Sequence, residues 1–104
     1  NSTPEGRFIV RKHSKLIDPA WVNPRTREKF AGSDPDNPIG ERWIGLRPLD
    51  EAIADAIDYG IHGTIEPESI GRQASMGCVR LRPEDVALVY EMLVEEASLV
   101  AIVP

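Results

Sequence analysis

The chain has 104 residues, the length of one ordinary domain. Charged residues make up 28% and hydrophobic residues 41%, a composition typical of globular proteins. Twelve basic against seventeen acidic residues give a net charge of −5, which argues against a general nucleic-acid binder. No apolar run approaches the roughly 18 residues that a membrane span needs.

The first half of the chain is rich in turn-forming residues. A turn over 3–6 leads into a short strand predicted over 7–10. Four of the nine prolines fall between 18 and 38, which predicts a long irregular surface loop. Trp21 and Phe30 lie inside that segment, and such large apolar side chains indicate an ordered loop. A further strand is expected over 39–46.

The second half alternates between strand and helix patterns. Apolar spacing predicts a short helix over 50–57 with Asp50 as N-cap, followed by a strand over 59–62. The clearest helix is expected over 83–94, since it begins with Pro83 and two acidic residues. Its predicted apolar face consists of Val86, Leu88, Val89, Met92 and Leu93. With a closing strand over 99–103, the chain is expected to form a mainly β domain with at least one packed α-helix.

The stretch around the single cysteine has the residue types of a nucleophilic site. Cys78 follows Gly77 and precedes Arg80 by two positions, and His62 lies sixteen positions upstream. A thiol needs a neighbouring imidazole because its thiolate is a minority species at neutral pH. Gly77 allows the backbone N–H groups to approach a developing oxyanion, and Arg80 could hold a substrate carboxylate or brace the site.

Structural interpretations of these residues stay open on this evidence alone. A free cysteine is commonly a buried small hydrophobe, and one cysteine excludes an internal disulfide. A lone histidine is commonly a hydrogen-bonded scaffold residue, which is our interpretation of His13. Arg80 could equally be a structural ion-pair partner. Two histidines and one cysteine are too few for the usual four-ligand zinc site unless carboxylates complete it.

The arrangement of motifs resembles the catalytic domain of the L,D-transpeptidases, also called the YkuD-type domain. The resemblance runs nearly from end to end. It rests on an H-G-T histidine motif followed some fifteen residues later by S-x-G-C-I/V-R, and on T-P-x-G-x-F, proline-flanked Trp and N-P-I/L-G segments. Taken in the same order, these five motifs stand at His62-Gly63-Thr64, 75–80, 3–8, 19–24 and 37–40.

The resemblance implies a fold and a set of roles. The fold would be an L,D-transpeptidase-like β-barrel or sandwich. Cys78 would be the nucleophile and His62 the base, with the Gly63 carbonyl orienting the imidazole. The N–H groups of Gly77 and Cys78 would hold the oxyanion, while Ser75 and Arg80 would support the site. No metal or organic cofactor is implied.

The implied reaction takes place on bacterial peptidoglycan, in the periplasmic or extracytoplasmic cell envelope. The enzyme would cleave the bond between the third and fourth residues of a tetrapeptide stem, release D-Ala and form a thioester. A stem amine would then give a cross-link between third-position residues, whereas water would give L,D-carboxypeptidase activity. Carbapenem β-lactams would be inhibitors. The alternatives are a sortase-like enzyme and a peptidoglycan-binding module with an inert cysteine and an ordinary thiol titration.

The sequence departs from the family pattern at three places. Several strands normally precede the T-P-x-G-x-F turn, so residues 1–104 are expected to be the C-terminal larger part of the domain. We expect the missing strands to accompany the chain as a cleaved piece or swapped element, since they would otherwise leave 8–10 on an unpaired sheet edge. Ala97-Ser98 replaces the usual Gly-Thr, and 49–58 is expected to be a helical insertion.

Overall fold

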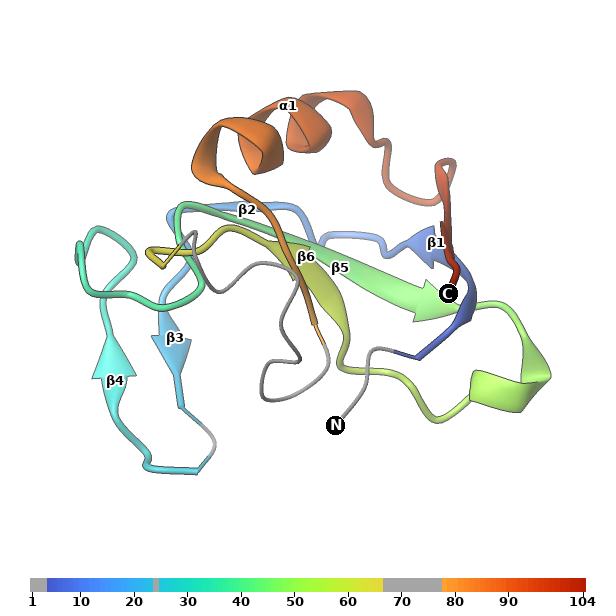
Figure 1. Cartoon of the computed structure of the whole chain (residues 1–104), viewed down its shortest axis with the longest axis horizontal. Helices are drawn as coiled ribbons and strands as arrows, with labels where there is room; N and C mark the ends of the chain where they lie inside the picture. The colour runs from blue at the N-terminus through green and yellow to red at the C-terminus, as the bar shows by residue number, and fades with distance from the viewer. Residues whose placement is uncertain (1–3, 24, 67–77) are drawn as a thin grey trace.

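The computed structural model describes residues 4–23, 25–66 and 78–104. Its main sheet has six strands in the order β7-β6-β5-β1-β8, with β2 pairing beside them to β5 (Figure 1). The strands are β1 (Gly6–Val10), β2 (Leu16–Ile17), β5 (Arg42–Pro48), β6 (Gly60–His62), β7 (Val79–Arg80) and β8 (Leu99–Ile102). The helix α1 (Pro83–Met92) lies over the sheet, so the predicted mainly β fold with a packed helix is confirmed.

The strand β1 lies inside the sheet, between two other strands. It pairs antiparallel with β5 on one side and with β8 on the other. Phe8 and Val10 are completely buried, because they project into the hydrophobic core. The expectation that residues 8–10 would lie on an unpaired edge is therefore wrong in this structure, because the C-terminal strand β8 covers that side.

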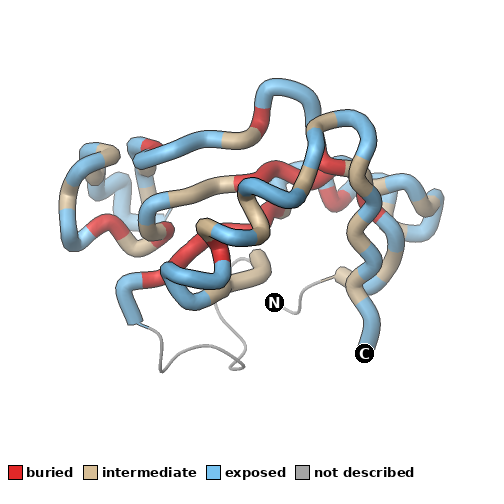
Figure 2. The backbone as a smooth tube through the Cα atoms, turned by 90° about the horizontal axis from the view of Figure 1, so that it is seen from above, coloured by how far each residue is buried: buried red, intermediate tan, exposed pale blue. Residues whose placement is uncertain are grey.

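The hydrophobic core lies between α1 and one face of the sheet, where buried residues gather along the central strands (Figure 2). Val86 of α1 packs in one cluster with Ile44, Leu46 and Ile61. The helix begins at Pro83 as predicted and ends at Met92. Leu88 and Met92 are 61% and 67% exposed, so their assignment to the apolar face is wrong. The helix packs instead through the positions of Val86, Val89, Tyr90 and Leu93, spaced by three and four residues.

The proline-rich segment has structure of its own, contrary to the irregular loop expected there. The strands β3 (Trp21–Val22) and β4 (Lys29–Phe30) pair antiparallel as a hairpin. Trp21 and Phe30 are cross-strand partners with stacked rings 6.0 Å apart. The two apolar anchors therefore hold each other, and they explain why the segment is ordered.

Two other predicted elements are shorter than expected. The strand predicted over 39–46 begins only at Arg42, because residues 38–41 form a turn. The helix predicted over 50–57 is a single 3₁₀ turn, η1 (Glu51–Ile53). Asp50 does not cap it through its side chain, since its carboxylate accepts hydrogen bonds from the backbone N–H and guanidinium of Arg7 at 2.6–2.8 Å.

The remaining strand predictions agree with the structure. The strand predicted over 59–62 is β6, and the closing strand predicted over 99–103 is β8. In the part of the chain that the structure describes, no helix is long and apolar enough to cross a membrane.

Candidate active site

His62 lies at the end of β6, in the middle of a row of side chains that crosses three strands. It is paired with Trp43 on the antiparallel neighbour β5 and with Arg80 on the parallel neighbour β7. Paired residues project their side chains to the same face of a sheet. The imidazole is consequently enclosed by neighbours on both sides, and His62 is only 7% exposed.

Cys78 comes directly before β7 and next to the histidine strand. The pairing of Ile61 with Val79 places Cys78 beside Gly60 when the register is extended by one residue. A hydrogen bond between the Gly60 backbone and the thiol agrees with that placement. Cys78 is therefore two residues from His62 along parallel strands, a Cα separation of about 8 Å from standard strand spacings. Two side chains on one face can close such a gap.

The tautomer of His62 follows from its first hydrogen bond. Nδ1 lies 2.5 Å from the carbonyl oxygen of Gly63. A carbonyl oxygen only accepts hydrogen bonds, so Nδ1 carries the proton. Nε2 then keeps its lone pair, which is the state that a general base requires. The contact implied by the family resemblance is thus present, and it needs no acidic side chain.

Burial favours the neutral forms of both candidate catalytic groups. Burial lowers the pKa of His62, the positive charge of Arg80 adds to this, and hydrogen bonding to the Gly63 and Ile39 backbones opposes it. Burial also raises the pKa of the Cys78 thiol, as does the negative charge of Asp58, against the Gly60 hydrogen bond. The resting pair is therefore a neutral imidazole and a neutral thiol. An ion pair formed in advance is not favoured.

A tight turn over 37–40, next to β5, supports the histidine. No role was predicted for this turn from the sequence. Asn37 is buried, and its amide nitrogen donates to the carbonyls of Pro19 and Ala31 at 2.8 and 3.2 Å. Its side-chain oxygen accepts from the N–H of Ile39 at 3.2 Å. One amide thus ties the base of the hairpin to the turn that reaches Gly40. An asparagine in a Pro-Gly turn was the signal available in the sequence.

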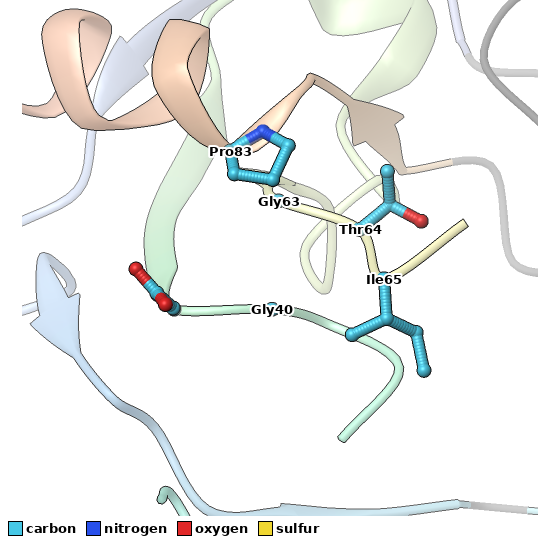
Figure 3. A pocket seen from close by; sticks show the side chains of 6 residues that line it. Gly40, Gly63, Thr64, Ile65 and Pro83 are labelled. Atoms are coloured by element: carbon cyan, nitrogen blue, oxygen red, sulfur yellow. The ribbon is translucent and has the colours of Figure 1, made fainter. Parts of the chain in front are cut away.

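A pocket of about 290 Å³ opens where this turn meets the end of β6 and the start of α1 (Figure 3). Its lining consists of Gly40, Glu41, Gly63, Thr64, Ile65 and Pro83. Thr64 is buried and its hydroxyl accepts from the N–H of Glu66 at 2.9 Å, which fixes the turn after the histidine. Gly63 lines the pocket and also accepts the hydrogen bond from His62.

The other predicted site residues divide into two groups. Arg80 lies on β7 directly beside His62 and contributes positive charge there. Ser75 and Gly77 lie outside the described residues. Trp43, which stacks on His62, was not predicted to be a site residue. Within residues 4–23, 25–66 and 78–104, no three His, Cys, Asp or Glu side chains are placed to hold a metal ion.

Comparison with known proteins identifies one family. The model of the YkuD L,D-transpeptidase catalytic domain matches residues 1–102. The chain belongs to the YkuD family of L,D-transpeptidase catalytic domains. This confirms the resemblance inferred from the His62 and Cys78 motifs.

Curated relatives of this YkuD domain carry the same family name. The chain is 39% identical over 92 residues to "Putative L,D-transpeptidase YqjB" of Bacillus subtilis, covering 88% of the chain and 47% of the relative. It is 37% identical over 102 residues to "Putative L,D-transpeptidase YkuD" of Bacillus licheniformis, covering 98% and 46%. The chain therefore spans about half the length of these curated relatives.

A solved structure supports the fold. Bd1075 of Bdellovibrio bacteriovorus superimposes with a TM-score of 0.59 at 15% identity, over 98% of this chain and 33% of that one. At this identity the likeness concerns the arrangement of strands and helix alone. It agrees with the β-rich YkuD fold described above.

Proposed function

We propose that this domain is a cysteine-dependent L,D-transpeptidase acting on the tetrapeptide stems of peptidoglycan. The observation that carries the proposal is the anchored imidazole of His62. Its Nδ1–H donates a hydrogen bond to the carbonyl oxygen of Gly63, so Nε2 stays basic. The strand that carries this imidazole lies next to Cys78. Family membership over residues 1–102 supports the same reaction class.

The proposed first step transfers one proton and forms one bond. His62 Nε2 takes the thiol proton as the Cys78 sulfur attacks the carbonyl carbon of the third stem residue. The carbon–nitrogen bond to the terminal D-Ala breaks, His62 returns the proton to the leaving amine, and a thioester remains. General-base attack fits the neutral resting pair, because a protonated imidazole could not accept the proton.

The second step resolves the thioester. An amine from a neighbouring stem loses its proton to His62, attacks the thioester carbonyl and releases the Cys78 thiol, which gives a cross-link between third-position residues. Water in place of the amine gives carboxypeptidase activity. We assign the N–H groups of Gly77 and Cys78 to the oxyanion, and support of the site to Ser75 and Arg80. We propose the periplasmic or extracytoplasmic envelope as the compartment, because peptidoglycan would be the substrate.

The two alternatives differ from this proposal in what they need from the site. A sortase-like enzyme also uses His, Cys and Arg, but Arg80 here is paired with the histidine itself and only two residues from Cys78. A peptidoglycan-binding module needs no anchored base. Thiol titration does not separate a binding module from an enzyme here, because burial keeps even a nucleophilic Cys78 protonated at rest. Detection of the acyl-enzyme does separate them.

The test uses a purified tetrapeptide stem and mass spectrometry of both enzyme and products. The wild type should release D-Ala, gain the mass of the acyl tripeptide on Cys78 and, with an acceptor amine present, give the dimer. Cys78→Ser should remain folded and lose the thioester adduct. Binding of the stem without D-Ala release or adduct, under conditions where the stem is in excess over the enzyme, would overturn the proposal in favour of a binding module.

A further inference from the structure

The geometry points to Trp43 as a positioning residue of the candidate pair: its indole fixes the plane of the His62 imidazole and fills the space over Gly60 beside Cys78. This inference rests on the proposed function, because it assigns Trp43 a part in the same acyl transfer. Nothing in the motif comparison gave Trp43 a role. The assignment follows from the register of three strands.

The contact between the two rings is direct. Trp43 and His62 are cross-strand partners on β5 and β6. Their ring centroids are 5.8 Å apart and their planes differ by 18°, which is a stacked arrangement. Aromatic pairs at this separation attract each other beyond the effect of burial alone. The indole therefore covers one face of the imidazole.

The stack supplies a constraint that the backbone hydrogen bond lacks. The bond from Nδ1 to Gly63 fixes one edge of the ring, yet the ring can still tilt about that edge because the second side-chain torsion of histidine has a broad minimum. Contact with the indole on one face restricts this tilt. The two constraints together set the direction of the Nε2 lone pair.

Gly60 shows that the indole also extends toward the thiol. A Cβ placed on Gly60 would lie 2.5 Å from Cζ2 and 2.6 Å from Cη2 of Trp43. These atoms belong to the six-membered ring, so that ring occupies the position a side chain at Gly60 would take. Gly60 is the residue beside Cys78. The indole thus lies over the histidine and over the neighbour of the cysteine at once.

Trp43 also affects the protonation of His62, because its indole helps to bury the imidazole. The half-buried indole replaces water on one side of His62, which favours the neutral imidazole. On the other side, β7 contributes the positive charge of Arg80 and the thiol of Cys78. Arg42 on β5 projects to the helix side of the sheet, where its guanidinium lies over the ring of Tyr90. Removal of the indole should therefore change how His62 titrates.

The experiment compares Trp43→Ala, Trp43→Leu and Trp43→Phe with the wild type. Phe keeps a stacking ring, Leu keeps apolar bulk without a ring face, and Ala keeps neither. The matched control is Trp21→Ala, since the other tryptophan of the chain stacks on Phe30 in the hairpin. The readouts are the single-turnover rate of Cys78 acylation and the NMR titration of the His62 ring, assigned with His13→Gln.

We expect Trp43→Ala to lower the acylation rate about ten- to a hundredfold, the scale of a small misplacement of a catalytic group. Its His62 pKa should move up toward the ordinary value, Trp43→Phe should restore most of both properties, and Trp21→Ala should change neither. A Leu variant that matches Phe in rate would overturn stacking as the cause. So would an Ala variant that loses only folding stability.

Two further outcomes are decisive. If Trp43→Ala does not fold, the comparison of Phe with Leu tests the same point at similar bulk. If the wild type acylates no stem, the proposed function fails, while the NMR titration still tests the position of the imidazole. An unchanged His62 titration in all folded variants would overturn the assignment of Trp43.

Discussion

The backbone of Gly40 lies directly against that of Gly63, and a Cβ on Gly40 would lie 2.9 Å from the carbonyl carbon of Gly63. Gly40 has a φ of +72°, a conformation that side chains rarely adopt. The same Gly63 carbonyl accepts the hydrogen bond from Nδ1 of His62. The turn at 37–40 therefore supports the acceptor that holds the candidate base, which gives a physical reason for glycine in that motif.

Substitution of Gly40 should test this support. Gly40→Ala should lower the free energy of unfolding by about 2 to 4 kcal/mol, from the positive φ together with the close contact. It should also slow acylation of Cys78, since Gly63 must shift. Gly40→Asn serves as the control, because asparagine tolerates positive φ while still carrying a Cβ. Urea unfolding and stem acylation measure the two effects; a Gly40→Asn variant with wild-type rates would contradict the contact.

Removal of the Asn37 amide should loosen the same turn. Asn37→Ala leaves the carbonyls of Pro19 and Ala31 and the N–H of Ile39 without their buried partner. We expect a loss of about 3 kcal/mol in the free energy of unfolding, measured with urea. Asn37→Asp retains the acceptor for Ile39 but turns a buried carboxylate oxygen toward the carbonyls of Pro19 and Ala31, so it should lose at least as much as Ala. Equal stability of wild type and Ala would show that water replaces the amide.

The pH dependence of acylation follows from the two shifted groups. Because the pKa of His62 is lowered, its neutral form persists below the ordinary value of about 6.5. The acylation rate should therefore fall with decreasing pH only once the pH is below that ordinary pKa. Because the pKa of Cys78 is raised, alkylation by iodoacetamide, which needs the thiolate, should keep rising above the ordinary value of about 8.5. An alkylation plateau at acidic pH would instead reveal an ion pair formed in advance.

Carbapenems should acylate the same sulfur as the stem. Their strained ring presents a carbonyl carbon to Cys78, and ring opening supplies the leaving nitrogen. Intact-mass measurement should find one adduct on the wild type and none on Cys78→Ala. His62→Gln should form the adduct at least a hundredfold more slowly, the scale of general-base catalysis at about 10² or more. An adduct on Cys78→Ala would place the reaction at another residue.

Local patterns were sufficient for several parts of this fold. The strand β1 follows from the turn that precedes its apolar residues, and the start of α1 follows from Pro83 with its acidic neighbours. The candidate pair was found by motif, because His62 and Cys78 stand in short segments of unusual composition. The structure adds that these segments become neighbouring parallel strands.

Other features depend on contacts that the sequence does not display. Asp50 has the right position for an N-cap, but Arg7, far away in sequence, binds its carboxylate. Leu88 and Met92 match the helical period, yet α1 covers the sheet with a stripe that excludes them. Trp43 could be placed over His62 only after the register of β5 and β6 was known. Long-range pairing therefore decided what local periodicity left open.

The stacking of Trp43 on His62 also gives this protein an optical signal at its candidate base. A protonated imidazole quenches the fluorescence of an indole in contact with it, whereas a neutral imidazole does so much less. The second tryptophan, Trp21, stacks on Phe30 and has no such partner among the described residues of its hairpin. Emission from Trp43 in a Trp21→Phe background would therefore report in real time, without any label, when the imidazole gains and releases its proton.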